Sequence, residues 1–181
     1  MTRAAYVLMT TVASVGAAYA ATIPTPLKLI WNVSASVPVG LYSLEPADHL
    51  EITDLVAVIP PPPLAALLIE RGYLGEATPL LKRVMGLPGQ EVCRLGDAIT
   101  VDGVPLGEAL TRDRMGRDLP VWQGCRRIEP GHLFLMNLEV SYSLDGRYFG
   151  PIPATAVIGR AMPLLTDEAG HGEFVWHAVV R

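Results

Sequence analysis

Residues 99–106, ITVDGVPL, carry the strongest local folding signal in this chain of 181 residues. In that stretch Asp102-Gly103 separates two short runs that are rich in apolar and β-branched side chains. An Asp-Gly pair is favoured in the two-residue turns that join antiparallel strands, because both turn positions need a positive φ. The stretch therefore predicts a β-hairpin.

Short apolar runs of the same kind continue on both sides of this hairpin. One segment differs, because residues 64–71 (LAALLIER) combine strong helix formers with helical spacing and are followed by Gly72. The polar residues 107–120 predict an exposed excursion. The expected fold is mostly β with one short helix, and its other strands are predicted at 54–59, 80–85, 91–95, 132–138 and 156–162.

Composition narrows the class of protein. Half of the residues are hydrophobic and 18% are charged, whereas soluble domains usually carry about 25% charged residues. The 14 Lys and Arg against 18 Asp and Glu give a formal net charge of −4. This balance argues against a nucleic-acid partner, which would require a basic surface, and the high apolar content argues against disorder.

The excess of apolar residues is concentrated at the start of the chain. Residues 4–27 contain no charge, and as a helix they could cross a hydrocarbon core about 30 Å thick. We therefore expect an N-terminal signal or transmembrane anchor helix over residues 1–27 and an exported folded domain over residues 28–181, because Arg3 favours a cytoplasmic amino terminus. We favour an uncleaved anchor. The alternatives are a secretory signal cut after Ala18-Tyr19-Ala20 and a buried core helix.

The cysteine count fits an exported protein. The chain contains two cysteines, Cys93 and Cys125, and such a pair predicts a disulfide; two small buried thiols are the alternative. We expect no metal, because neither cysteine lies in a Cys-x-x-Cys pair and the four histidines are scattered. We also expect no cofactor, because the chain lacks the P-loop, GxGxxG, HExxH and EF-hand motifs.

Three separate segments together suggest a family. They are residues 32–42 (NVSASVPVGLY), 81–90 (LKRVMGLPGQ) and 141–153 (SYSLDGRYFGPIP). In this order, behind an apolar start, they resemble the signal peptidase I family of serine–lysine endopeptidases. The Ser-x-Pro-x-Gly-Leu-Tyr form of the first segment is similar to the TraF-type branch, the conjugal-transfer pilin peptidases. The resemblance covers about residues 32–165 and implies a signal-peptidase-like antiparallel β-sheet catalytic domain.

The resemblance implies a nucleophile, Ser36, and a general base, Lys82. It also implies an oxyanion hole formed by the Ser34 hydroxyl and the Ser36 N–H. A serine hydroxyl needs a base to take its proton as it attacks, and a lysine can be that base only when it is neutral. Its reference pKa of about 10.4 must then fall by about 2–3 units, which burial among apolar side chains can achieve. Taken alone, Lys82 could be a solvated lysine and Ser34 a turn serine.

The third segment supplies the supporting residues that the resemblance implies. Ser143 corresponds to a hydroxyl that orients the lysine amine, and Asp145 and Arg147 correspond to an acidic and basic pair. A hairpin turn at Asp145-Gly146 is the alternative. This chain differs from the common family pattern at Gly146, where Ser is frequent, and at Val37, where Met is frequent.

The function that the resemblance implies is cleavage of an exported precursor after small residues. The enzyme would lie at the bacterial inner membrane with its catalytic domain in the periplasm. Its substrate would be a conjugative pilin subunit, whose new end is either hydrolysed or joined into a ring, and its partners would include conjugation or type IV secretion components. Two alternatives remain open: a general leader peptidase, and a non-enzymatic periplasmic subunit of a secretion apparatus.

Overall fold

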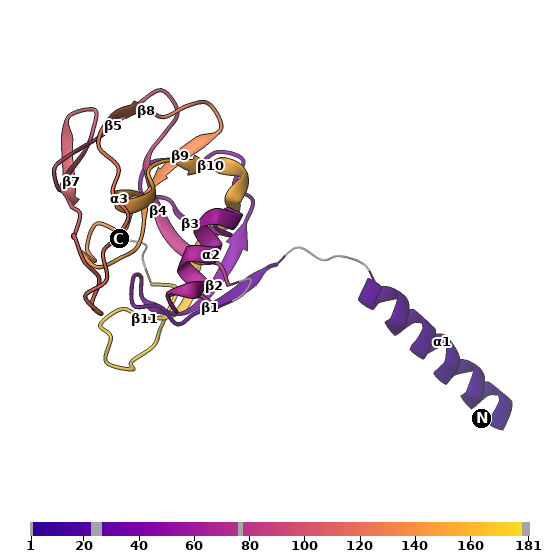
Figure 1. The fold of residues 1–181 in the computed structure, drawn as a ribbon. Coiled ribbons are helices and arrows are strands. Elements are labelled where there is room, and N and C mark those ends of the chain that lie inside the picture. Colours follow the sequence, from indigo (N-terminus) through magenta and orange to yellow (C-terminus); the bar gives the residue numbers. More distant parts are fainter. Residues whose placement is uncertain (1, 23–26, 76–77, 179–181) are drawn as a thin grey trace.

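The computed structural model describes residues 2–22, 27–75 and 78–178, and Figure 1 shows their arrangement. Most elements are antiparallel strands in two sheets. Helix α1 (Arg3–Thr22) stands apart from both sheets in Figure 1. The predicted mostly-β class is therefore confirmed.

The larger sheet carries most of the segments singled out in the sequence. Its strand order is β1-β2-β11-β3-β4-β9-β10, with β12 paired to β11. Strand β11 is long enough to pair with both β2 and β3, and its register shifts between Pro163 and Leu165. Such a bulge bends and twists a strand, which helps the sheet to curl. The strands are Leu29–Asn32 (β1), Val39–Glu45 (β2), Leu55–Val58 (β3), Leu80–Gly86 (β4), His132–Leu135 (β9), Ile152–Pro153 (β10), Val157–Asp167 (β11) and Val175–Trp176 (β12).

The smaller sheet contains the predicted hairpin. Strands β6 (Ala98–Val101) and β7 (Val104–Glu108) flank Asp102 and Gly103, whose φ values are 47° and 79°. Strand β5 (Glu91–Leu95) pairs with β6 and with β8 (Gly124–Arg127). The two sheets pack together through one shared apolar core. The smaller sheet contributes Val92, Ile99 and Val101, and Phe134 of β9 and the neighbouring residues Ile128 and Met136 also belong to it.

The helices partly correct the sequence prediction. Helix α2 (Pro62–Glu70) corresponds to the helix predicted over 64–71 and starts earlier, because proline is well suited to the first turn of a helix. The expectation of one short helix was wrong: Gly146–Phe149 form a second, α3, and Ala154–Ala156 form a 3-10 turn. The alternative of a hairpin turn at Asp145-Gly146 was also wrong, since the Asp145 side chain caps α3.

The N-terminal segment is helical, but its predicted membrane-spanning character is not confirmed. Among the described residues, no helix combines the length and the apolarity that crossing a bilayer requires. The reason lies in composition, because Ala, Gly, Ser and Thr dilute the larger apolar residues of α1. Residues 1 and 23–26 of the predicted segment lie outside the described residues.

Candidate active site

The turn between β1 and β2 carries Ser34 and Ser36. Asn32, the last residue of β1, holds this turn through its side chain. Its Nδ2 donates to the carbonyl oxygens of Ser34 at 2.8 Å and Pro38 at 3.0 Å, and its Oδ1 accepts from the Ser34 N–H at 3.0 Å. The backbone around Ser36 is therefore fixed by a side chain of the larger sheet.

The two serines bond to each other in the free protein. The Ser36 N–H donates to Ser34 Oγ at 3.3 Å, and the Ser34 hydroxyl donates to Ser36 Oγ at 3.1 Å. Ser34 is exposed and Ser36 is half-buried. The two donors expected for an oxyanion, the Ser34 hydroxyl and the Ser36 N–H, thus lie beside Ser36 Oγ. In the free protein the first donates to Ser36 Oγ and the second to Ser34 Oγ.

Strand β4 brings Lys82 to the same place. Its Nζ lies 3.4 Å from Ser36 Oγ and donates to Ser143 Oγ at 2.8 Å. Only 5% of Lys82 is exposed, so the alternative of a solvated surface lysine is excluded. Burial lowers the pKa of Lys82 to about 8, against the opposing effect of the Asp145 carboxylate and with a smaller lowering by Arg147. Its amine can therefore be neutral at mildly alkaline pH.

A buried ion pair between Asp145 and Arg147 holds the loop that carries Ser143. Asp145 Oδ2 accepts from Arg147 Nη2 at 2.8 Å, and both side chains are almost fully buried. The Arg147 guanidinium also donates to carbonyl oxygens of the loop that leads to α3, those of Asn137, Val140, Ser141 and Ser143. The pair thus shapes the loop that presents Ser143 to Lys82.

Asn137 is a site residue that the sequence analysis missed. Its Nδ2 donates to the carbonyl oxygens of Ser36 at 2.9 Å and Leu81 at 3.1 Å, and its Oδ1 accepts from the Arg83 N–H at 3.1 Å. Its backbone N–H donates to Asp145. One buried side chain therefore joins the turn that carries Ser36 to strand β4, which carries Lys82. The polar residue directly after the apolar run 133–136 was the available signal.

These residues open onto a cleft of about 300 Å³. Ser34, Ser36, Lys82 and Ser143 lie along it. The lining of the cleft also includes residues from the predicted excursion, 107–120, which is hydrogen-bonded to Arg71 at the end of α2. Those residues are Leu110, Asp113, Arg114, Met115 and Leu119.

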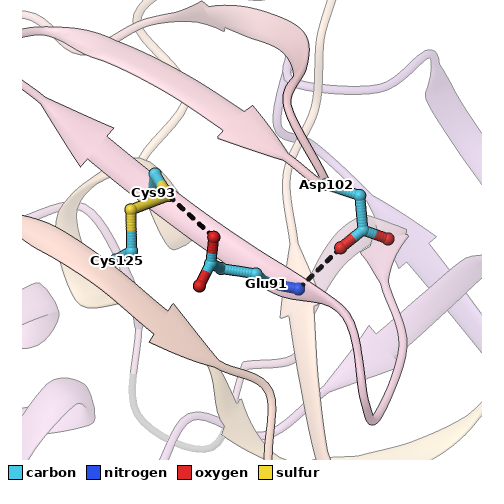
Figure 2. Close-up of a disulfide and its surroundings, with 4 residues drawn as sticks. All are labelled: Glu91, Cys93, Asp102 and Cys125. Atoms are coloured by element: carbon cyan, nitrogen blue, oxygen red, sulfur yellow. Dashed lines mark hydrogen bonds between the residues drawn. A yellow bond between two sulfur atoms is a disulfide. The ribbon is translucent and has the colours of Figure 1, made fainter.

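The two cysteines lie away from this cleft, in the smaller sheet. Figure 2 shows the disulfide between Cys93 on β5 and Cys125 on β8, with an S–S distance of 2.00 Å. Glu91 Oε1 lies 3.7 Å from Cys93 Sγ, and the Glu91 N–H donates to Asp102. Within the described residues, Glu91, Cys93 and Cys125 form the group whose ligand atoms could surround a metal. The disulfide removes both thiolates, so these residues do not fit a metal in this form.

A serine, a buried lysine and a supporting hydroxyl in a curled β-sheet define a class of protein, and comparison with known proteins identifies it. The family model described as "Signal peptidase, peptidase S26" matches residues 1–165. The chain therefore belongs to this family of peptidases, and the resemblance seen in the three sequence segments is confirmed.

Two curated relatives illustrate this similarity. The conjugal transfer protein TraF of Agrobacterium fabrum (strain C58 / ATCC 33970) is 39% identical over 147 residues, which cover 75% of this chain and 81% of the relative. The probable conjugal transfer protein TraF of Sinorhizobium fredii (strain NBRC 101917 / NGR234) is 36% identical over 145 residues, which cover 75% and 76%. A crystal structure of a signal peptidase I from Enterococcus faecalis V583 has a TM-score of 0.39 and 23% identity, covering 62% of this chain and 97% of that one.

Proposed function

We propose that this protein is a serine endopeptidase that uses Ser36 and Lys82 to process an exported precursor, a conjugative pilin subunit. The observation that carries the proposal is the buried Lys82 amine, 3.4 Å from Ser36 Oγ. A lysine in water is protonated at neutral pH and cannot accept a proton. Here burial lowers the pKa of Lys82 to about 8, which suits a general base near physiological pH.

In the first half of the reaction, the Ser36 oxygen attacks the carbonyl carbon after a small residue. The Ser36 proton passes to Lys82 Nζ, while Ser143 Oγ holds that amine in place by its 2.8 Å hydrogen bond. The protonated Lys82 then gives the proton to the departing amine. The carbon–nitrogen bond breaks and an ester on Ser36 remains.

The charge that develops on the substrate oxygen needs donors. We assign this role to the Ser36 N–H and the Ser34 hydroxyl, which in the free protein bond to Ser34 Oγ and Ser36 Oγ. Substrate binding must therefore turn the Ser34 side chain away from Ser36 and release both donors. One donor of this kind contributes about 10²–10³ in rate.

In the second half, a nucleophile attacks the ester carbonyl and regenerates Ser36. Lys82 takes the nucleophile's proton and returns one to Ser36 Oγ. If the nucleophile is water, the product ends in a free carboxyl group. If it is the amino end of the same substrate, an amide forms and the product is a ring.

Two features support a location at the periplasmic face of the inner membrane. A disulfide between Cys93 and Cys125 is typical of exported proteins. The exposed Trp31 ring packs at 5.8 Å from Phe174, and Trp176 is also exposed. Aromatic side chains of this kind suit the polar boundary of a lipid bilayer. We propose that this face rests on the membrane and brings the cleft close to a membrane-borne precursor.

The pilin substrate is proposed because the relatives described above are named conjugal transfer proteins. The test is co-expression of the chain with a candidate pilin precursor, followed by mass spectrometry of the pilin. We expect the native protein to shorten the precursor, and Ser36→Ala and Lys82→Met each to leave it at full length. A product whose mass is one water lower than that of the linear cleavage product would identify ring closure. Cleavage that persists in either variant would overturn the mechanism.

The second candidate function is that of a general leader peptidase, since the chain belongs to the signal peptidase family. Expression in cells depleted of their housekeeping signal peptidase separates the two functions. A general enzyme restores growth, and a pilin-specific enzyme does not. Conjugation partners such as type IV secretion components are proposed only for the pilin-specific enzyme.

A further inference from the structure

The excursion, residues 107–120, is anchored firmly against the end of helix α2. The Asp113 carboxylate accepts from Arg117 Nε at 2.7 Å and from the backbone N–H groups of Met115 at 2.8 Å and Arg117 at 2.9 Å. It also accepts from the Tyr73 hydroxyl. Arg117 continues to the carbonyl oxygen of Arg71 at 3.2 Å. The tip of the excursion is therefore a built part of the cleft.

Arg114 lies at this tip, next to the proposed catalytic residues. Its guanidinium carbon lies 3.5 Å from the centre of the Tyr142 ring, and Tyr142 precedes Ser143, which contacts Lys82. Both Arg114 and Tyr142 line the cleft with Ser36. Stacking restricts the guanidinium plane but leaves its edge N–H groups free, and these groups bind carboxylates in a two-pronged geometry.

Among the described residues that line the cleft, Arg114 is the arginine without a carboxylate partner. Two other arginines of the excursion have carboxylate partners, Arg112 with Asp118 at 3.1 Å and Arg117 with Asp113 at 2.7 Å. Across the described part of the chain, no ion pair links Arg114 to a carboxylate. Asp113, the acidic residue that lines the cleft, is already occupied by Arg117 and Tyr73.

We infer that Arg114 is a specificity-determining residue that binds a carboxylate of the precursor close to the bond that is cut. This inference rests on the proposed function and deepens it by naming the class of substrate, a segment that combines small residues with a nearby acidic group. The excursion then acts as a selective wall, because Tyr142 and the Asp113 anchor hold Arg114 at a constant position over the cleft.

The test uses the full chain and a set of peptides that contain an Ala-Gln-Ala cleavage sequence. One flanking position at a time carries either Glu or Gln, and kcat/KM is measured for each peptide. We expect the native protein to prefer Glu at one position by about fivefold, the size of a single exposed ion pair. Arg114→Gln should bring that ratio close to one, whereas Arg112→Gln, in the same excursion but paired with Asp118, should leave it unchanged. High salt should also reduce the native preference.

Binding keeps this inference separate from catalysis. The same peptides, labelled with a fluorophore, are titrated with the Ser36→Ala form and with Ser36→Ala/Arg114→Gln, and anisotropy gives both affinities. If no peptide is cleaved by the native protein, the proposed function fails, and the binding ratio alone decides the role of Arg114. The inference would be overturned if the native protein prefers Glu over Gln at none of the positions. It would also be overturned if Arg114→Gln leaves such a preference intact. Equal weakening of Glu and Gln peptides by Arg114→Gln would also overturn it, because that result indicates a structural role.

Discussion

The amine of Lys82 illustrates how neighbouring residues set the chemistry of one side chain. Burial in the larger sheet disfavours its charged form, and the Asp145 carboxylate that would restore the charge is already bonded to Arg147. Ser143 then supplies a hydrogen-bond partner without adding a charge. The result is an amine with a lowered pKa and a fixed direction, which is what a general base requires.

The pKa of Lys82 predicts the pH dependence of activity. Below about pH 8 the amine is mostly protonated and cannot accept the Ser36 proton, so kcat/KM should rise tenfold per pH unit and level off above that value. In the unfolded chain the pKa is that of an ordinary lysine, so between about pH 8 and 10.5 the unfolded state binds more protons and stability should rise with pH. Peptide cleavage and urea unfolding across pH measure both effects.

Lys82→Met is the matched control for the stability part. It should remove the rise in unfolding free energy over that pH window while keeping the strand intact. A kcat/KM profile that is flat between pH 6 and 9 would contradict the assigned role of Lys82.

Asn137 has a role that is purely positional. Asn137→Ala removes the bridge between the Ser36 and Leu81 carbonyl oxygens, so the distance between Ser36 and Lys82 is no longer held. We expect kcat to fall by about 10- to 100-fold with KM nearly unchanged, because small displacements of reacting groups strongly affect the chemical step. Steady-state kinetics measures the split, and Leu138→Ala, at an exposed neighbouring position, serves as the control. A raised KM with an unchanged kcat would contradict the prediction.

At the scale of elements, each sequence segment of the family pattern has a structural task. The first forms the turn that carries Ser36 and the start of β2, where the Tyr42 hydroxyl donates to the Pro38 carbonyl oxygen at 2.7 Å. The second is β4 with the turn after it, and the third is the loop and cap of α3. The first segment also contains Gly40. A glycine is required at this position, because β11 passes too close to leave room for a side chain.

Gly40→Ala should therefore destabilise the fold strongly. Gly40 has a φ of +152°, and a Cβ at this position would lie within 3 Å of the Leu165 carbonyl oxygen and of Thr166 Cα. We expect a loss of at least about 3 kcal/mol, from backbone strain and overpacking together. Gly103→Ala is the comparison, since Gly103 has a φ of +79° but open space around it, and should cost about 1 kcal/mol. Chemical denaturation measures both, and equal losses would refute the close-approach explanation.

At the scale of the whole molecule, the larger sheet carries the proposed catalytic residues and the smaller sheet supports the excursion. The chain leaves β7, forms the excursion along the cleft and returns as β8, where Cys125 is bonded to Cys93. The disulfide thus closes the segment that contains the wall of the cleft. The shared core of the two sheets links this wall to the larger sheet.

Removal of the disulfide by Cys93→Ser/Cys125→Ser should lower stability. The cysteines are 32 residues apart. Closing a loop of that length lowers the conformational entropy of the unfolded chain and so raises the free energy of unfolding by about 3–4 kcal/mol. In a protein of this size that corresponds to a fall in Tm on the order of 10 °C. Thermal unfolding with and without a reductant measures it, and the reductant should have no effect on the double variant. An unchanged Tm of the native protein after full reduction would contradict the prediction.

Local patterns predicted much of the fold. The Asp102-Gly103 turn, the helix behind the proline run and most strands came from spacing and turn chemistry alone. Strands β1, β2, β8, β10 and β12 were not predicted, because each is defined by its pairing with another strand and not by a local pattern. Helix α3 was missed because its formation depends on the Asp145 cap and on buried contacts across the sheet.

The sequence by itself determined the mostly-β class, the family, and the candidates Ser34, Ser36, Lys82, Ser143, Asp145 and Arg147, because each depends on residue types in short segments. Only the tertiary structure decided that Lys82 is buried beside Ser36, that Asn137 joins the Ser36 turn to the Lys82 strand, and that the excursion lines the cleft with Arg114 at its tip. These features join residues far apart in the chain. Burial and the pKa of Lys82 depend on what surrounds a side chain in three dimensions, which no local pattern specifies.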